Sequence, residues 1–449
     1  MNTIQITAKI NSIFLAVILV IGTFAVVYPS FIIGIQAQSE YEDDYGYDKS
    51  NNNYSYKSAK HPPVEYPPVE YETDRYNAPE YPSPSYEYPK SEYPQNEYES
   101  NQEKDFYNYP PTESIYPDIV VPIDFPTIQD AINAANEGDV IKVLPGTYTE
   151  QLTISKNITI IGSGAKSTII EAPPLEELEL NVIGLPYIVE VNNGAEVTIK
   201  GFTIKGPQGT DCGQLIGVSV IEDGTINLQH AVIKGCTLNS VAVGFEGTGH
   251  ATITKTFITD YREHGVFAIG PNTTLTMSYN KVLGSAPDAF AITGILFVFN
   301  ATGTITNNEV SKNICDIPNT CGPDWFNQFQ AFGIVADSAG EDSVIANNYV
   351  TNNDAGIGVF GASGCCIVDY NKLKDNRFFG VIIGDSEHIV SNSKIFGGQI
   401  GAAAIATFDN TTAILDQVKI VGAEIPIQSL SSGNLTAAIN VLSPSFFQP

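Results

Sequence analysis

Asp260, Arg262 and His264 are the residues whose types and spacing come nearest to a catalytic group. They occupy alternate positions, so in a locally extended segment all three side chains point to the same side. A carboxylate, a guanidinium and an imidazole held together can remove a proton beside a uronate carboxyl. Charged and amide residues also collect in the solvated turns of repetitive folds. We favour the turn interpretation and keep the three residues as catalytic candidates.

Further polar residues precede later strands of the chain in the same way. Asp354 and Arg377 are predicted to contact a ligand, because both enter the same column of strands as His264. Solvated turns are again the alternative. The complete set of such residues is Asp288, Asn353, Asp354, Lys374, Asp375 and Arg377.

An insertion at residues 315–329 departs most from the rest of the chain and contains its only tryptophan, Trp325. Insertions in repetitive folds usually lie on one face, which is often the binding face. Trp325 is a candidate to stack on a sugar ring, with Phe326 and Phe329 beside it, and Asp324 is a further ligand-binding candidate. A Cys315 to Cys321 bridge would close the loop.

The alternative is that the same aromatic side chains fold onto Leu296 and Val335 and only cover apolar surface. Both interpretations follow from the burial of aromatic area. The sequence leaves this choice open.

Six cysteines fit an oxidising compartment. Cys212 and Cys236, about one repeat apart, form a second candidate disulfide, and one thiol of the adjacent Cys365 and Cys366 is expected to be plainly buried. The chain has no CxxC or histidine-rich pattern, so we predict no metal and no cofactor. Calcium has no supporting motif either.

A recurring strand pattern must position all of these residues. A small residue followed by an alternating apolar strand returns every roughly 20 to 30 residues, and a second strand followed by asparagine lies between most copies. The asparagines Asn280, Asn308, Asn348 and Asn371 are expected to take the left-handed turn conformation and to hydrogen-bond to one another in a ladder. The strands begin at Gly217, Ser240, Gly265, Gly294, Gly333, Gly356, Gly380 and Gly401.

This periodicity predicts an all-β fold, a right-handed parallel β-helix solenoid. Residues 127–135 have helical spacing of apolar residues, with Thr127 as N-cap and Gly138 as stop, and are predicted to cap the open end. The outward residues of the recurring strand are then Ser219, Ala242, Phe267, Leu296, Val335, Gly358, Ile382 and Ala403, none of which is a general acid or base.

Composition divides the chain into four parts. Residues 1–38 are a signal peptide, or a signal anchor if uncleaved. Residues 39–117 are rich in tyrosine, proline and glutamate and are predicted to be a disordered spacer that folding does not require; an adhesive tyrosine strip is the alternative. Residues 118–424 are the β-helix, and residues 425–449 are a C-terminal cap or tail.

The formal net charge is -28, from 50 acidic and 22 basic residues. This charge argues against a nucleic acid or an anionic membrane surface as partner. Contact with a membrane is expected only through an uncleaved N-terminal segment. We expect an extracellular or cell-surface location, with which the acceptor sequons at Asn53, Asn157, Asn272, Asn300, Asn410 and Asn434 agree.

Two stretches resemble known families. The N-terminal stretch resembles the first coils of pectin-lyase-like β-helix proteins, pectin methylesterases among them, and residues 252–401 resemble the parallel β-helix repeat proteins that include the NosD group. The resemblance covers most of residues 120–422 and implies the fold. The motifs that carry it are Phe125 to Ile132, Gly138 to Ile141, Leu144 to Tyr148 and Asn157 to Gly162.

The resemblance does not carry the families' catalytic motifs. The Gln-Asp-Thr-Leu and Asp-Phe-Ile-Phe-Gly stretches of methylesterases are missing, as is the paired-aspartate and Gly-His-Gly pattern of polygalacturonases. Our first hypothesis is therefore a non-catalytic protein that binds a glycan or an envelope protein. The alternatives are a polysaccharide lyase or esterase, and a NosD-like role in metal delivery.

Overall fold

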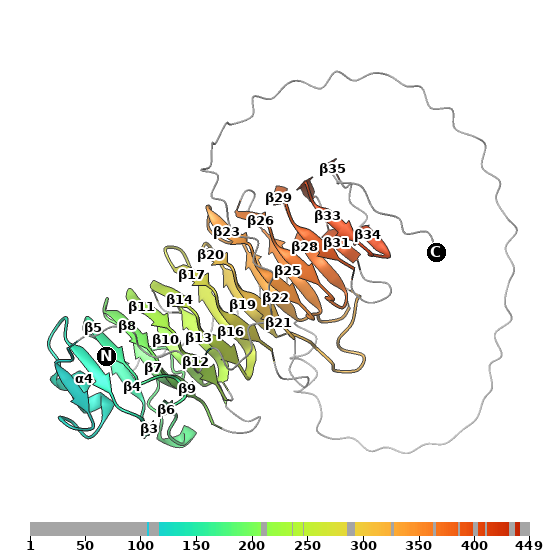
Figure 1. The fold of residues 1–449 in the computed structure, drawn as a ribbon. Helices are drawn as coiled ribbons and strands as arrows, with labels where there is room; N and C mark the ends of the chain where they lie inside the picture. Colours follow the sequence, from blue (N-terminus) through green and yellow to red (C-terminus); the bar gives the residue numbers. More distant parts are fainter. Residues whose placement is uncertain are drawn as a thin grey trace, which may run out of the picture. The chain divides into compact units, whose positions relative to one another are not determined.

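A computed structural model describes residues 106, 116–207, 213–235, 237–245, 247–284, 292–324, 327–361, 365–384, 387–397, 403–408, 411–430 and 436–440. Within these residues the chain winds into coils, and each complete coil contributes one strand to each of three parallel sheets. Figure 1 shows the strands of successive coils stacked side by side along one direction. The predicted all-β parallel solenoid is confirmed.

The first sheet has 13 strands in the described residues. They are β1 (Ile119–Val121), β2 (Val140–Val143), β5 (Ile158–Ile161), β8 (Glu196–Lys200), β11 (Gly224–Gln229), β14 (Gly249–Thr254), β17 (Thr274–Ser278), β20 (Thr302–Thr306), β23 (Ser343–Ala346), β26 (Cys366–Asp369), β29 (Glu387–Ser391), β32 (Thr412–Asp416) and β35 (Thr436–Asn440).

The second sheet has 11 strands in the same part of the chain. They are β4 (Leu152–Ile154), β7 (Tyr187–Val191), β10 (Ile216–Val220), β13 (Thr237–Val243), β16 (Tyr261–Ile269), β19 (Thr293–Val298), β22 (Phe332–Asp337), β25 (Ala355–Phe360), β28 (Phe379–Gly384), β31 (Ala403–Phe408) and β34 (Ile425–Ser429).

The third sheet also has 11 described strands. They are β3 (Gly146–Thr149), β6 (Thr168–Glu171), β9 (Thr203–Lys205), β12 (Val232–Lys234), β15 (Phe257–Thr259), β18 (Lys281–Leu283), β21 (Glu309–Ser311), β24 (Tyr349–Thr351), β27 (Lys372–Lys374), β30 (Lys394–Phe396) and β33 (Lys419–Val421).

The core is a stack of aliphatic side chains that point inward from all three sheets. In the second sheet Val241, Val266, Ile295 and Ile334 occupy the same register position on successive strands, and none is exposed. The glycine near the start of several strands of this sheet is required by close packing: a Cβ added at Gly356 would lie 2.5 Å from the carbonyl oxygen of Gly380. Register and close approach together fix one coil on the next.

The predicted asparagine ladder is present inside the turns. The side-chain Nδ2 of Asn280 donates to Oδ1 of Asn308 at 2.9 Å, and the same bond recurs from Asn308 to Asn348 and from Asn348 to Asn371, each at 3.1 Å. These asparagines are buried, so their mutual bonds satisfy polar groups that water does not reach.

The conformation predicted for the ladder asparagines was wrong. The left-handed residue is the one before each of them, for example Tyr279 with φ 59° before Asn280 and Asn347 with φ 57° before Asn348. The turn therefore has two adjacent positions with different structural roles. The first reverses the chain, and the second turns its amide inward to the ladder.

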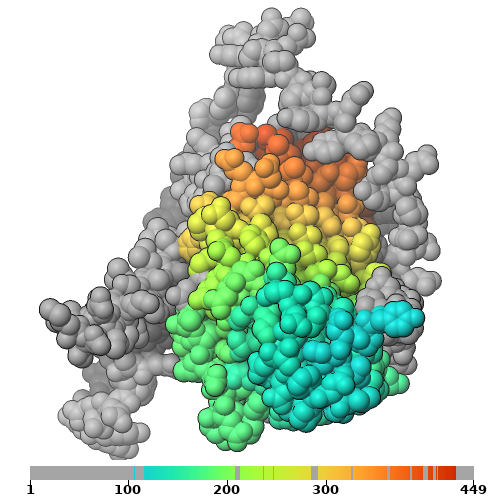
Figure 2. Space-filling model, turned by 90° about the vertical axis from the view of Figure 1, so that its left-hand side faces the viewer, coloured from blue at the N-terminus to red at the C-terminus, as the bar shows by residue number. Residues whose placement is uncertain are grey.

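A short helix, α4 (Ile128–Ala134), lies over the first coil, as predicted. The Thr127 side chain accepts a hydrogen bond from the Asp130 backbone N–H at 3.0 Å, and Ile128, Ala131 and Ile132 are buried. The helix ends before Gly138, which takes φ +86° in the following turn. Figure 2 views the molecule from this end, with the N-terminal coils in front of the later ones.

Phe106 lies within the range predicted to be spacer, yet its side chain is buried. Its ring centroid is 5.8 Å from that of Phe257, and both belong to an apolar cluster with Ala165 and Val232. Val232 and Phe257 are register partners on the third sheet, beside the inward residues Ile233 and Ile258. Phe106 therefore covers the outer face of that sheet.

Among the described residues, no helix is long and apolar enough to span a membrane.

Candidate functional site

Asp354 immediately precedes β25 and holds both ends of the inserted loop. Its Oδ2 atom accepts hydrogen bonds from the backbone N–H of Cys315 at 2.9 Å and of Ala331 at 3.0 Å. Cys315 begins the loop and Ala331 follows its last residues. One carboxylate oxygen thus fixes the entry and the exit of the segment.

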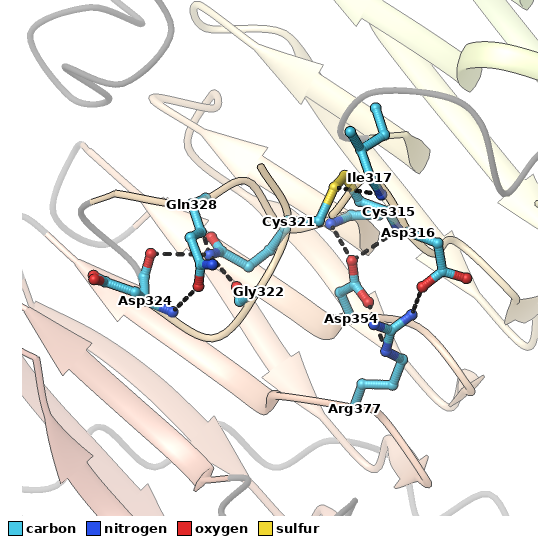
Figure 3. Close-up of a disulfide and its surroundings, with 11 residues drawn as sticks. Cys315, Asp316, Ile317, Cys321, Gly322, Asp324, Gln328, Asp354 and Arg377 are labelled. Atoms are coloured by element: carbon cyan, nitrogen blue, oxygen red, sulfur yellow. Dashed lines mark hydrogen bonds and ion pairs between the residues drawn. A yellow bond between two sulfur atoms is a disulfide. The ribbon is translucent and has the colours of Figure 1, made fainter. Parts of the chain in front are cut away.

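Arg377 lies one coil further along and pairs with the other oxygen of Asp354. Its Nε atom is 3.2 Å from Oδ1 of Asp354, and its Nη1 atom pairs with Asp316 at the start of the loop. Figure 3 shows the guanidinium between the two carboxylates. The contact with Oδ1 is an ion pair without hydrogen-bond geometry, because that oxygen has no hydrogen-bond partner.

Burial controls the ionisation of Asp354. Desolvation raises the pKa of this carboxyl to about 6, although the N–H groups of Cys315 and Ala331 and the charge of Arg377 oppose the shift. The side chain has no exposed surface. Asp354 therefore holds the loop and does not itself face a ligand.

The loop is closed by a disulfide between Cys315 and Cys321, as predicted, with Cα atoms 5.6 Å apart. Beyond it, Asn327 donates from Nδ2 to Oδ2 of Asp324 at 2.9 Å, and both side chains are exposed. The buried Gln330 donates to the carbonyl oxygens of Gly322 and Gln328 at 2.7 Å. A carboxylate and an amide are thus presented on a fixed loop. Trp325 and Phe326 lie outside the described residues.

Asp260, Arg262 and His264 do not have the extended geometry under which they would align. Between Tyr261 and His264 the register against β13 shifts at a β-bulge, and Asp260 has φ 66°. The Asp260 carboxylate accepts a hydrogen bond from the Gly235 backbone N–H at 3.4 Å. A bulge inserts an extra residue, so the alternation that would place the three side chains on one side is lost.

His264 is half-buried, with its imidazole against an aromatic ring. Its ring centroid is 5.0 Å from that of Phe267, and desolvation lowers the imidazole pKa to about 4. Arg262 is exposed. The imidazole is therefore neutral at pH 7 and packs as part of the outer face of the second sheet.

Other sequence-based candidates have different outcomes. Asp288, Cys212 and Cys236 lie outside the described residues. The interpretation of Cys365 and Cys366 as plain buried cysteines was wrong, because the two are joined in a disulfide. Both side chains remain in the core cluster.

The outward column of the second sheet differs from the predicted one at both ends. Ala403 pairs with Phe379, and the residue that follows Ile382 in the column is Ala406. At the other end the column continues from Ser219 through Glu190 to Thr153. Sequence analysis missed Glu190, although its strand Tyr187–Val191 has an alternating pattern, because that strand lacks the initial small residue.

Glu190 is a buried acid on the outer side of the sheet, only 3% exposed. Asn192 donates to its Oε1 atom at 3.0 Å. Desolvation raises the pKa of this carboxyl, against hydrogen bonding by Asn192, Ser219 and Asn181. The column therefore contains a titratable group, contrary to the sequence-based expectation.

The family comparison decides the hand of the helix. Residues 187–365 match the family model described as right handed beta helix region. These residues form a right-handed β-helix region. The coils on either side of it pair in the same three sheets, so the right-handed β-helix continues through them. No curated protein matches the chain.

Solved structures with a similar fold include carbohydrate-active proteins. The catalytic domain of a GH87 alpha-1,3-glucanase in complex with tetrasaccharides is 15% identical, with 75% of this chain and 71% of that chain covered and a TM-score of 0.38. Tailspike protein 2 of an Escherichia coli O157:H7 bacteriophage is 14% identical, with 73% and 42% covered and a TM-score of 0.41.

A pectin methylesterase in complex with a hexasaccharide is 11% identical, with 74% of this chain and 94% of that chain covered and a TM-score of 0.31. Identities and scores at this level do not bear on the activity of the β-helix described here.

Proposed function

We propose that this right-handed β-helix is an extracellular or cell-surface protein that binds a glycan through its inserted loop without catalysing a reaction on it. The observation that supports this most directly is how the charged residues that were predicted to contact a ligand are arranged. Asp354 and Arg377 hold the loop in place, whereas Asp324 and Asn327 present an exposed carboxylate and amide. Fixed polar pairs of this kind bind sugar hydroxyls.

The disulfides support the location. Cys315–Cys321 and Cys365–Cys366 are typical of a protein exposed to an oxidising environment. The apolar N-terminal segment agrees with export, and envelope proteins are a further class of partner. Trp325 and Phe326 follow Asp324 directly in the sequence, and on that ground they are included in the proposed binding surface.

Glycan-array binding followed by titration tests this function. We expect the Asp324→Ala and Asn327→Ala double variant to lose most of the binding of the glycan that the wild type selects. Glu341→Ala, an exposed acid before β23, is the control and should bind like the wild type. Absence of any glycan binding, or equal binding by the double variant, would contradict the proposal.

A polysaccharide-active enzyme is the second candidate, and Glu190 is the observation that favours it. A buried carboxyl with a raised pKa keeps its proton to higher pH than an exposed one and can act as a general acid. Cleavage or deesterification of uronate polymers by the wild type, lost in Glu190→Gln, would establish this function instead. For the metal-delivery hypothesis, no cluster of three or more His, Cys, Asp or Glu suited to a metal occurs in the described residues.

A further inference from the structure

The outer face of the first sheet carries a regular array of uncharged side chains. β11, β14, β17 and β20 pair without a register shift, so their outward residues lie in columns that cross the strands (Figure 1). Each strand has three outward positions, and nine of the twelve hold threonine or serine. We call these twelve positions the hydroxyl grid. Its middle column consists of Asn227, Thr252, Thr276 and Thr304.

The hydroxyl grid repeats in two directions at distances that the backbone fixes. Neighbouring strands lie ~4.8 Å apart, and outward residues along one strand are separated by twice the ~3.3 Å rise per residue. Thr276 is the register partner of Thr252 on one side and of Thr304 on the other. Threonine is branched at Cβ and has few side-chain rotamers, so its hydroxyl and methyl groups keep these spacings. All twelve side chains are exposed or half-buried and reach water.

The hydroxyl grid is free of charged side chains, although the chain is strongly acidic. Its positions include no Asp, Glu, Lys or Arg, whereas the whole chain has 50 acidic and 22 basic residues. Charged outward residues lie beyond its two borders, Lys200 on β8 and Asp369 on β26. A charged group holds a hydration shell of its own. Water on the grid is therefore arranged by the hydroxyl groups and by their spacing.

We propose that the hydroxyl grid binds the surface of ice. The prism face of an ice crystal repeats at nearly the strand spacing in one direction and at slightly more than twice the residue rise in the other. Each hydroxyl donates and accepts hydrogen bonds, as each water molecule of the crystal does. Waters held by the grid can therefore continue into the crystal. The inference does not rest on the proposed function, because the inserted loop joins strands of the other two sheets.

A glycan suits this face less well than an ice surface. Sugar sites combine an aromatic platform with polar groups that converge in a hollow. None of the twelve grid positions holds Phe, Tyr or Trp. Outward side chains in register on neighbouring strands also point the same way and do not converge. The grid matches an occupant that is itself periodic in two directions and uncharged.

Thermal hysteresis, the gap between the melting and freezing temperatures of a single ice crystal, tests the proposal with the full-length protein. We expect a gap that widens with protein concentration, together with faceted crystals. Serum albumin at the same mass concentration is the reference and should give neither. Absence of both effects at the highest soluble concentration of the wild type would overturn the proposal.

Lysine variants locate the ice-binding face. Thr252→Lys and Thr276→Lys each place a long, strongly hydrated cation in the middle column and should remove most of the gap. Thr147→Lys places the same side chain at an exposed threonine on β3, in the third sheet, and should keep the wild-type gap. Thermal unfolding checks that each variant is folded, and Thr252 is exposed, so its replacement disturbs the core least. Equal gaps in all three variants, or equal losses, would show that this face does not bind ice.

The Asp324→Ala and Asn327→Ala double variant separates this proposal from the proposed function. It should keep the full thermal hysteresis even where it has lost the array-selected glycan, and Thr276→Lys should keep the glycan. If Thr276→Lys loses the glycan and the wild type gives no hysteresis, the face binds a glycan and the ice proposal fails.

Discussion

Arg377 places its Nε atom 3.2 Å from Oδ1 of Asp354, a carboxylate with no exposed surface. Asp354 and Arg377 lie on successive coils. Together they hold a loop that begins at Cys315, earlier in the chain. Of the acids in the part of the chain that the structure describes, the helix thus uses the most buried one to fix an insertion. This arrangement leads to predictions that separate loop anchoring from ligand contact.

Removing Arg377 should destabilise the β-helix. Arg377→Ala leaves Asp354 buried without a cation, which we expect to cost about 2 kcal/mol at pH 7, below the usual loss for a broken buried pair because Asp354 can take up a proton. Urea unfolding measures this. Lys374→Ala removes a solvent-exposed ion pair with Asp375 from the same turn and should change the free energy of unfolding by less than about 1 kcal/mol. Equal losses in the two variants would contradict the role of the buried pair.

Stability should depend on pH through Asp354. Its pKa in the folded protein is about 6, above the ordinary 3.8, so the folded state keeps the proton to higher pH than the unfolded state. Stability from this group is complete below about pH 4 and is lost as pH rises through 6. The Asp354→Asn side chain still accepts hydrogen bonds from the backbone but does not titrate. Over that interval, the free energy of unfolding of the variant should therefore fall by about 2–3 kcal/mol less than that of the wild type. Parallel curves for wild type and variant would refute the shift.

His264 should not titrate above about pH 5, since desolvation beside Phe267 lowers the imidazole pKa to about 4. Nuclear magnetic resonance of the imidazole protons checks this. We also expect His264→Ala and Asp260→Ala to alter no polysaccharide-cleaving or deesterifying activity. A reproducible activity lost in either variant would restore the catalytic interpretation of the two residues.

The end of the predicted spacer should contribute to stability through one residue. Phe106→Ala removes a buried ring from Phe257 and should cost about 2 kcal/mol, the usual value for burying an aromatic side chain. Deleting residues 40–100 should leave the melting temperature unchanged. Tyr116→Ala is the control, since Tyr116 is 89% exposed. A melting temperature unaffected by Phe106→Ala would show that the contact does not persist in solution.

Trp325 should be partly exposed and should contribute affinity more than stability. Its fluorescence reports a single site, because the chain has one tryptophan. We expect emission open to a soluble quencher in the free protein and protected on glycan binding. If the ring is buried, its emission will instead be blue-shifted and protected from the quencher. Trp325→Ala would then lower the free energy of unfolding by the ~3–5 kcal/mol typical of a truncated core aromatic.

The sequence determined the coil. Alternating strands, a small residue at the start of most strands of one sheet and asparagine in several turns are local patterns that repeat, so one coil predicts the next. Gly356 must be small because the Gly380 carbonyl lies above it, and Asn308 must be asparagine-like because Asn348 accepts its proton. The capping helix was predictable because its start is local: the Thr127 side chain accepts a hydrogen bond from Asp130, three residues further along the chain.

Only the tertiary structure decided what the polar side chains do. The bulge before His264 shifts the register by one residue, and a shift of one reverses the face on which a strand side chain lies. Asp354 meets Cys315, Ala331 and Arg377 across three separate segments, which no local pattern encodes. Glu190 became part of the outward column through its pairing with Thr153, because strand register is set by contacts between coils and not within them.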